Sequence, residues 1–447
     1  MDTICANATA PGGALTVLRL SGEAALPAAL RLWQGSSAPD RPANHRRLLM
    51  GSLHDTDGSL IDPQCLLVYM PAPHSYTGED VVELQCHGGS LITRLALAAL
   101  QQSGARAALP GEFTRRAFLN GKLDLTQAEA VAELISAESG AALSAASRQL
   151  NGLLGERIGR VYSQLGVILA ELESHLDFPE EELEWIPTGE LAQQLRQASA
   201  EIMALWKTRR TGEILRHGIS MVIAGAPNAG KSSLLNRWLG RERAIVSDIP
   251  GTTRDTVEAD FVLQGIPVHL IDTAGIRQSG DPIEQCGIRR TREAAEQADI
   301  VLWLRDCTND TAEAQWPQWP LRGTLIRVAS KCDLPVQNAA QTDEIAVCAL
   351  SGEGLDHLES AVTAAVLAPA GLHSLAEATV TVNARHAALL KTAAEALDTT
   401  CPLLCANEWE LAAIPLRNAI SACGEIIGKS PSPDILDTIF HRFCIGK

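Results

Sequence analysis

The chain has 447 residues, of which 46% are hydrophobic and 20% are charged, with a formal net charge of −16 at pH 7. This length predicts two to four domains, each large enough to bury its own core. The composition excludes a fibrous or wholly disordered protein, and the acidic balance excludes broad, nonspecific binding to polyanions.

The spacing of the cysteines and the first residues of the chain indicate the cellular compartment of the protein. The 11 cysteines form no CxxC pairs, which argues against a zinc module. Met1-Asp2-Thr3-Ile4 lacks a basic segment followed by an apolar one, and no apolar run reaches the roughly 18 residues of a spanning helix. We therefore expect a cytoplasmic protein with reduced thiols, no signal peptide and no membrane span.

Charge clusters leave two readings open. Arg115-Arg116, Arg209-Arg210 and Arg289-Arg290 with Arg292 are candidates for a local basic patch that binds nucleic acid. Solvated surface arginines are the commoner explanation for any one of these pairs. The acidic run Asp177–Glu184 is read as a solvated loop rather than a metal site, because nothing in the sequence fixes its geometry.

Residues 1–117 predict an α+β domain. Apolar, strand-like runs cover Ala14–Leu20, Leu66–Met70 and Val81–Cys86, and Leu91–Leu100 has the spacing of a helix.

Two helical stretches follow, one on each side of a nucleotide-binding segment. Between Leu143 and Leu172 apolar residues recur every three or four positions, and a second helix is predicted over Gly189–Arg210. Helical stripes return at Arg385–Asp398 and Leu411–Ala422. We expect the stretches to pack as one bundle. Its first part is residues 118–213, its second part is residues 371–447, and the domain of residues 214–370 is inserted between them.

The inserted domain opens on a phosphate-binding loop. The run Gly225–Ser233 reads GAPNAGKSS and lies between an apolar strand, Ile219–Ala224, and the start of a helix near Leu234. Backbone N–H groups of such a turn and the helix N-terminus together favour a di- or triphosphate. Lys231 is expected to reach the terminal phosphates and Ser232 to ligate Mg²⁺. The spacing and context disfavour an accidental Gly-rich loop.

Two later motifs indicate a GTPase with a mostly parallel, Ras-like sheet. A threonine-containing loop, Ser247–Asp255, precedes a strand, where GTPases sense the γ-phosphate through Mg²⁺. The apolar run Val268–Ile271 then ends in Asp272-Thr273-Ala274-Gly275. An aspartate there can hold the metal's hydration shell, and the glycine N–H can bind the γ-phosphate.

Base recognition departs from the usual pattern. After the apolar run Thr324–Ala329, the sequence Ser330-Lys331-Cys332-Asp333 stands where GTPases usually carry Asn-Lys-x-Asp. Asp333 can accept from both N–H groups of guanine, whereas Ser330 is expected to shorten or lose one contact at a cost of about 1 kcal/mol. Cys348-Ala349-Leu350 stands where a Ser-Ala-x loop would back the base.

The residue that usually orients the attacking water is also missing from its expected position. Ras-type enzymes orient the attacking water with a glutamine directly after DxxG, and this chain has Ile276 there. Glu284 is a candidate replacement. Its alternative role is to cap a helix over Gln285–Gln297, and position alone leaves both open.

Four segments together resemble the MnmE (TrmE) family of tRNA uridine-modification GTPases, and the resemblance runs from end to end. They are Asp2-Thr3-Ile4, Ser75–Gly89, Gly111–Leu125 and Phe443–Lys447. The resemblance implies an N-terminal domain that binds folate and forms a homodimer, a central helical domain and a GTPase domain inserted in it. It also implies a complex, as a heterotetramer, with the flavoprotein MnmG (GidA). The substrate would be the wobble uridine, position 34, of certain tRNAs, converted to a 5-aminomethyl or carboxymethylaminomethyl form.

The same resemblance assigns ligands and site residues. The ligands are GTP, Mg²⁺, K⁺ and a 5-formyl- or methylene-tetrahydrofolate. Glu284 matches the residue that orients water for hydrolysis, and K⁺ would supply charge where other GTPases use an arginine finger. The Mg²⁺ ligands would be Ser232 and Thr253; the K⁺ ligands Asn228, Ser247, Ile249 and Thr252; the folate contacts Arg19, Glu83, Lys122 and Lys447. The remaining GTP contacts would be Ala229, Gly230, Lys231, Ser233, Asp248, Pro250, Gly251, Asp272, Thr273, Ala274, Gly275, Ser330, Lys331, Asp333, Cys348, Ala349 and Leu350.

Departures from the family pattern concern Ser330, Cys348 and an early turn, Pro11-Gly12-Gly13, which is shorter and lacks an arginine. Cys444 is either a reactive thiol near the folate or a buried terminal anchor, and we favour the structural role because nothing nearby in sequence would lower its pKa. The rival functions are a GTPase that acts in ribosome assembly or RNA binding without modification chemistry, and a regulatory switch that performs no chemistry.

Overall fold

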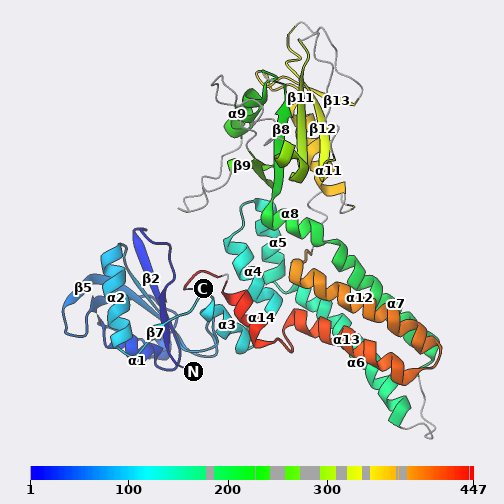
Figure 1. Cartoon of the computed structure of the whole chain (residues 1–447). Helices are drawn as coiled ribbons and strands as arrows, with labels where there is room; N and C mark the ends of the chain where they lie inside the picture. The colour runs from blue at the N-terminus through cyan, green and yellow to red at the C-terminus, as the bar shows by residue number, and fades with distance from the viewer. Residues whose placement is uncertain are drawn as a thin grey trace. The chain divides into compact units, whose positions relative to one another are not determined.

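The computed structural model describes residues 2–177, 186–226, 228–241, 257–271, 292–308, 320–334, 343–368, 371, 380–441 and 443–446. Figure 1 shows the whole chain. It divides into two compact units. Unit 1 comprises residues 1–132, 149–166 and 420–447, and unit 2 comprises residues 133–148 and 167–419. Among the described helices, none combines the length and the apolar character needed to cross a bilayer.

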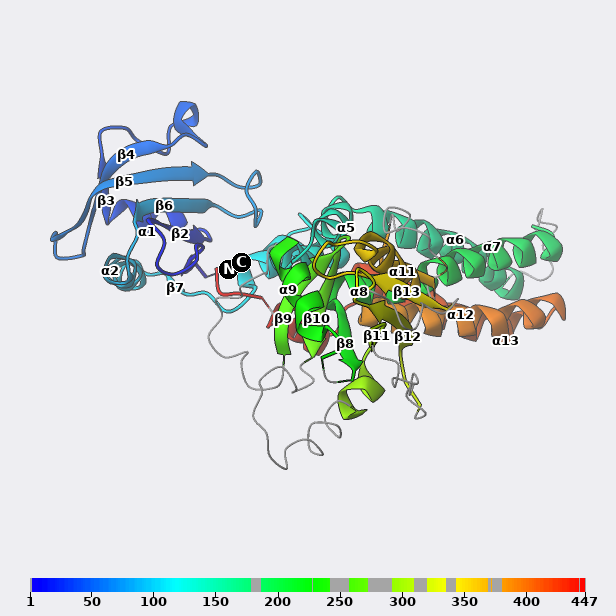
Figure 2. The same ribbon diagram turned by 90° about the horizontal axis from the view of Figure 1, so that it is seen from above.

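Unit 1 contains a seven-stranded sheet in the order β3-β4-β5-β6-β2-β1-β7 (Figure 2). The strands are β1 (Ile4–Asn7), β2 (Leu15–Ser21), β3 (Trp33–Gly35), β4 (Leu49–His54), β5 (Leu60–Met70), β6 (Val81–His87) and β7 (Arg106–Ala107). Neighbours are antiparallel except β1 and β7, which are parallel. The predicted strands of the first domain are confirmed within one or two residues, except that β5 begins six residues earlier than expected.

Helices α1 (Ala25–Leu30) and α2 (Ser90–Gln102) supply the core on one face of this sheet. Because side chains alternate along a strand, Leu18 and Leu20 of β2 join this core together with Leu84 of β6. The residues between them, Arg19 and Glu83, therefore point to the other face.

Helices from both ends of the chain complete unit 1. They are α3 (Glu112–Leu119), the N-terminal part of α4 (Leu125–Ile135) and α14 (Pro433–Phe440). A short 3-10 helix, Pro42–Asn44, lies between β3 and β4. Leu125, Phe440 and Phe443 are buried in one apolar cluster. Gly111 has φ of 65° and lies against the backbone of Phe440, so a side chain there would be strained and would clash.

Unit 2 contains a six-stranded sheet in the order β13-β12-β11-β8-β10-β9 (Figure 1). Its strands are β8 (Ile219–Gly225), β9 (Val257–Leu263), β10 (Ile266–Ile271), β11 (Ile300–Asp306), β12 (Thr324–Ser330) and β13 (Glu344–Val347). All described neighbours are parallel except β9 and β10, which confirms the prediction of a mostly parallel sheet.

Helices cover both faces of this sheet. On one face α9 (Lys231–Arg241) and α11 (Leu355–Leu367) contribute Trp238, Leu355 and Leu358 to the main core. On the other face, Ala295 and Ala298, in and after the helical residues 292–297, pack with Val222 of β8. The helix after the phosphate-binding loop begins at Lys231, three residues earlier than expected.

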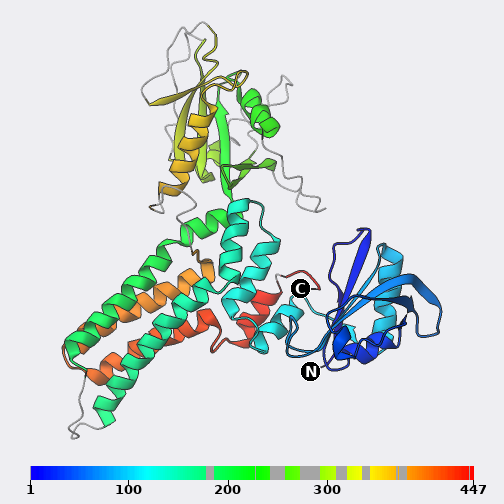
Figure 3. The same cartoon turned by 180° about the vertical axis from the view of Figure 1, so that it is seen from behind.

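The predicted bundle helices are present in unit 2 and at its boundaries (Figure 3). They are α5 (Gly140–Leu150), α6 (Leu153–Asp177), α7 (Thr188–Lys207), α8 (Arg209–His217), α12 (Ala384–Cys405) and α13 (Trp409–Ile427). Helices α7 and α12 lie along each other. The single helix predicted over Gly189–Arg210 is wrong in one respect: α7 ends before Thr208, whose hydroxyl donates to the carbonyl of Leu205 at 2.7 Å and competes with the helical pattern.

Candidate functional site

The phosphate-binding loop connects β8 to α9 through a run of unusual backbone conformations. Gly225 has φ of 141° and packs so closely on the backbone of Leu304 that a side chain would clash. Asn228 has φ of 61° and Gly230 has φ of 90°, and Asn228 is exposed. Asparagine and glycine are the residues that best tolerate positive φ, so this sequence suits the turn that it adopts.

Lys231 lies over this loop. Its Nζ donates to the carbonyl oxygens of Gly225 at 3.0 Å and Ala226 at 2.9 Å. Burial lowers the pKa of Lys231. An ammonium group has three donors, so these two contacts leave one for a phosphate oxygen held by the loop.

A cavity of about 270 Å³ opens beside the loop. This volume is close to the lower end of the range for small-molecule pockets, about 300–1,000 Å³. The cavity is lined by Gly230, Ser233, Leu234, Leu304, Val328, Ser330, Lys331, Asp333, Leu334, Val347, Cys348, Ala349 and Leu350. The structure therefore brings together three segments that the sequence analysis chose separately: the phosphate-binding loop, the Ser330–Asp333 motif and the Cys348–Leu350 loop.

Ser330 joins two of these segments. Its Oγ lies 2.7 Å from the carbonyl oxygen of Ala229 and 3.0 Å from that of Arg305, and the residue is 7% exposed. The hydroxyl can donate to either carbonyl. Sequence reasoning treated Ser330 only as a lost contact to guanine and missed this link between the base motif and the phosphate loop.

Lys331 and Cys348 are held by neighbouring groups. Lys331 Nζ lies 2.6 Å from Asp306 Oδ2. Burial alone would raise the pKa of Asp306, but hydrogen bonds from Lys331 and then Thr308 lower it. Cys348 Sγ accepts from the N–H of Ser351 at 3.2 Å, and the Cys348 N–H donates to Glu353 at 2.9 Å. A cysteine therefore maintains the turn where a serine was expected. Asp333 is exposed at the cavity mouth.

Several predicted residues lie outside the described residues. These are Ser247–Thr253, Asp272–Gly275, Ile276, Glu284 and Lys447. Residues 178–184 of the acidic run and the pair Arg289-Arg290 also lie outside the described residues. Among the residues that are described, no group of three or more His, Cys, Asp or Glu side chains is placed to hold a metal ion.

On the face of the N-terminal sheet opposite α1 and α2, where Phe113 of α3 packs, Arg19 and Glu83 are direct cross-strand partners. The Arg19 Nε lies 2.8 Å from Glu83 Oε1, and the two side chains are 20% and 18% exposed. Aromatic rings flank the guanidinium, with centroids 5.7 Å away for Tyr76 and 5.8 Å away for Phe113. The sequence analysis did not single out these two aromatic residues, although both lie within the segments that carry the family resemblance.

Lys122 is connected to the same loop that carries Tyr76. Its Nζ donates to the carbonyl of Pro73 at 3.1 Å, and its stem lies against Gly78. Gly78 has φ of 79°, which favours glycine at that position. Arg19 and Lys122 therefore both contact one loop, residues 73–78.

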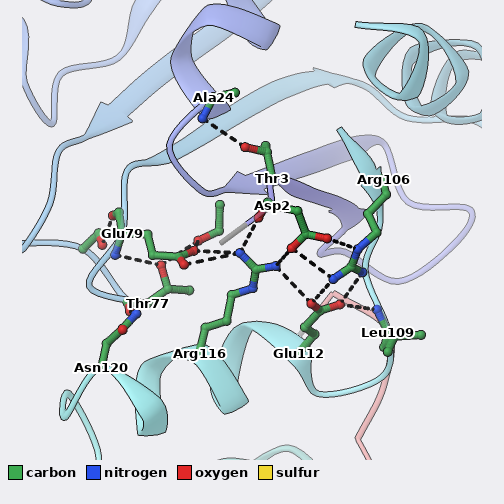
Figure 4. Close-up of polar contacts among 12 residues, drawn as sticks. Asp2, Thr3, Ala24, Thr77, Glu79, Arg106, Leu109, Glu112, Arg116 and Asn120 are labelled. Atoms are coloured by element: carbon green, nitrogen blue, oxygen red, sulfur yellow. Dashed lines mark hydrogen bonds and ion pairs between the residues drawn. The ribbon is translucent and has the colours of Figure 1, made fainter. Parts of the chain in front are cut away.

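An ionic cluster centred on one buried arginine lies next to this loop (Figure 4). Arg116 is 3% exposed, and its guanidinium pairs with Asp2 at 2.8 Å, Glu79 at 3.0 Å and Glu112 at 3.1 Å. Arg106 pairs with Asp2 and Glu112, each at 2.5 Å. Three of the segments that resemble the family thus meet around the guanidinium of Arg116. Because this arginine is buried and paired with three carboxylates, its role is structural.

Among the arginines considered for a basic patch, Arg116 fits neither of the two readings. Arg116 is neither solvated nor available to nucleic acid, because carboxylates surround it in the interior. Arg115 pairs with Asp437 at 3.2 Å, and Arg210 pairs with Asp299 at 2.6 Å. Arg209 stacks over Trp206, with its Cζ 3.3 Å from the ring centroid. Cys444 is exposed, so it is not a buried anchor.

Sequence comparison gives two consecutive family matches. Residues 3–122 match the N-terminus of the GTP-binding protein TrmE, and residues 125–444 match the MnmE helical domain. A solved structure of Era from Aquifex aeolicus bound to GDP.AlF4- is 24% identical over 40% of this chain and 66% of its own, with a TM-score of 0.26. A TM-score this low supports no assignment, so the family relationship rests on the sequences.

Two full-length relatives carry the name tRNA modification GTPase MnmE. The protein from Akkermansia muciniphila is 42% identical over 448 residues, covering 100% of this chain and 99% of the relative. The protein from Symbiobacterium thermophilum is 44% identical over 462 residues, with the same coverage of both chains. Because the similarity extends over both proteins from end to end, this chain belongs to the MnmE family of tRNA modification GTPases.

Proposed function

We propose that this chain is a potassium-dependent GTP hydrolase that, with a flavoprotein partner, modifies C5 of the wobble uridine of certain tRNAs to an aminomethyl or carboxymethylaminomethyl form. The observation that carries the proposal is the end-to-end similarity to tRNA modification GTPases, supported by the cavity in which the phosphate loop and the base motifs converge. The match over residues 3–122 disfavours a ribosome-assembly GTPase, because such a factor needs no TrmE-type N-terminal domain.

The residues around the cavity fit a guanine nucleotide. The loop amides and Lys231 suit the phosphates, and the carboxylate of Asp333 at the cavity mouth suits the two N–H groups of guanine. We assign Mg²⁺ to Ser232 and Thr253, and K⁺ to Asn228, Ser247, Ile249 and Thr252. Bound cations would offset the negative charge that develops on the phosphates during hydrolysis. Glu284 would hold the attacking water, because Ile276 offers no hydrogen bond.

A reduced folate, 5-formyl- or methylene-tetrahydrofolate, is the one-carbon donor in this proposal. The observation that supports it is the partly exposed Arg19–Glu83 pair, whose guanidinium lies near two aromatic rings. A carboxylate beside a guanidinium presents acceptors and donors that suit a pterin edge, and Lys122 with Lys447 would suit the folate's own carboxylates. A homodimer and the MnmG flavoprotein complete the proposed assembly.

The test is GTP turnover by the full chain in potassium and in sodium buffers of equal ionic strength. We expect stimulation by potassium that is lost in Asn228→Ala. Glu284→Ala should lower kcat by about 100-fold or more, since positioned acid–base groups contribute at least that much. Asn236→Ala, an exposed asparagine on α9, is the matched control and should behave as the wild type. Equal turnover in both salts together with indifference to Glu284 would contradict the mechanism.

A further inference from the structure

Two thiols face each other beside the guanine-binding motif. Cys307 directly follows β11, and Cys332 lies two residues after the end of β12, within the Ser330–Asp333 motif. Their Sγ atoms are 3.7 Å apart. The backbone holds them in place, because Asp306 and Ser330 are register partners and the Cys307 N–H donates to the carbonyl of Ser330 at 3.1 Å.

We propose that Cys307 and Cys332 are a reversible thiol-modification site, which a small-molecule disulfide converts to an intramolecular disulfide that weakens guanine-nucleotide binding. The effect on binding rests on the proposed function of the cavity. Formation of the bond itself does not.

Exposure distinguishes this pair from a second one. Cys332 is partly exposed and Cys307 is buried. In the N-terminal sheet, Cys65 and Cys86 are also close, with Sγ atoms 3.5 Å apart, but their exposures are 0% and 1%. An oxidant must meet one thiol of a pair before the second can react. The structure therefore allows attack at Cys332, whereas the pair in the sheet is closed to solvent.

The reaction proceeds by two thiol–disulfide exchanges. The Cys332 thiolate attacks the small disulfide, forming a mixed disulfide and releasing one small thiol. The Cys307 thiolate then attacks Cys332 Sγ and releases the second small thiol, and the two protons lost by the cysteines end on the small thiols. Two protein thiols are oxidised and one external disulfide is reduced. Burial, followed by the hydrogen bond with Cys332, raises the pKa of Cys307 to about 12, so the second exchange is the slow one.

Bond formation must move the guanine-binding motif. The two sulfur atoms have to approach from 3.7 Å to about 2.05 Å. Cys332 Sγ now donates to the carbonyl of Ala329 at 3.1 Å, and this contact is lost if the sulfur turns toward Cys307. Its neighbours Lys331 and Asp333 line the nucleotide cavity. Displacing them lowers guanine affinity, and by linkage a bound nucleotide must disfavour the disulfide by the same factor.

The experiment incubates the full chain in glutathione redox buffers for several hours, with and without saturating GDP. Peptide mass spectrometry measures the Cys307–Cys332 cross-link, and fluorescence titration measures GDP affinity. We expect the cross-link to form, Cys65 and Cys86 to stay reduced, and GDP affinity to fall about tenfold and recover with dithiothreitol. Saturating GDP should then shift the redox midpoint of the cysteine pair by about 30 mV, because a tenfold change in an equilibrium constant corresponds to this shift for a two-electron couple.

Variants separate the possible outcomes. Cys332→Ser and Cys307→Ser should abolish both the cross-link and the loss of affinity, whereas Cys405→Ser, at an exposed helical cysteine, should retain them. GDP binding by each reduced variant shows that it is folded. A glutathione adduct on Cys332 without the cross-link would overturn the proposal, as would a cross-link that leaves GDP affinity unchanged. Failure of the reduced wild type to bind GDP would instead overturn the proposed function, because the cross-link is measured independently.

Discussion

Ser330 Oγ lies between two carbonyl oxygens, 2.7 Å from that of Ala229 and 3.0 Å from that of Arg305. One carbonyl belongs to the phosphate-binding loop and the other to β11. A single buried hydroxyl therefore links the strand that ends at the predicted base motif to the predicted phosphate-binding loop. The motif spacing alone predicted which segments matter. It did not predict this link, because the identity of a short polar side chain does not reveal which distant carbonyl it reaches.

We expect Ser330→Ala to weaken GDP binding about fivefold. Removing the hydroxyl leaves buried carbonyls without their donor, at a cost of about 1 kcal/mol, and loosens the phosphate loop at Ala229. Isothermal titration with GDP checks the prediction. Ser360→Ala, at an exposed α11 serine whose hydroxyl donates to Asp356 at 2.8 Å, is the matched control and should bind as the wild type. Unchanged affinity in Ser330→Ala would show that the link does not support the site.

Among the elements, β11, β12 and β13 form the scaffold of the nucleotide cavity. Arg305 of β11 reaches past β12 to Glu344 of β13, with Nε 2.7 Å from Oε1 and Nη2 2.5 Å from Oε2. The two side chains are 5% and 0% exposed. The adjacent pair Arg327–Asp343 is far more open, at 34% and 53%. Both pairs connect to residues at the start of β13, and they differ mainly in burial.

Glu344→Gln should destabilise β11–β13 by about 3 kcal/mol, because it removes the buried carboxylate that pairs with the Arg305 cation. Asp343→Asn is the matched control. We expect it to destabilise the same strands by at most about 1 kcal/mol, since solvent screens an exposed pair. Hydrogen exchange of peptides from β11 and β12, followed over a urea series, measures both. Equal effects of the two substitutions would contradict the assigned difference in burial.

How far sequence predicts these elements depends on their length and patterning. Long apolar runs and stripes were placed well, such as Val81–Cys86 in β6 and Arg385–Asp398 in α12. The short strands β3 and β7, with three and two residues, have no periodic signal to detect. The break at Thr208 depends on one side-chain hydrogen bond. The pairing of Arg19 with Glu83 depends on the register of β2 and β6. The family resemblance named both residues as folate contacts but did not indicate that they pair with each other.

For the whole molecule, the contacts of unit 1 join segments from both ends of the sequence. Residues 420–447 belong to the same compact unit as residues 1–132, and Phe440 and Phe443 share a core with Leu125. The sequence analysis expected the two helical stretches to pack together, and the contact of Leu125 with Phe440 and Phe443 is of that kind. It gave no sign that α14 also contacts α3, where Arg115 pairs with Asp437. Apolar stripes show that a helix has a buried face, but they do not identify its partner.

We propose that the whole protein modifies the wobble uridine of tRNA and uses GTP to do so. The most direct measurement is nucleoside mass spectrometry of tRNA from cells that lack this chain, and from the same cells supplied with the wild type, Lys231→Ala or Asn236→Ala. We predict that the C5 substituent at position 34 disappears with the chain and returns with the wild type and the Asn236 variant. It should not return with Lys231→Ala, whose phosphate-binding ammonium is removed. Wobble uridines that keep their substituent in the absence of the chain would contradict the account.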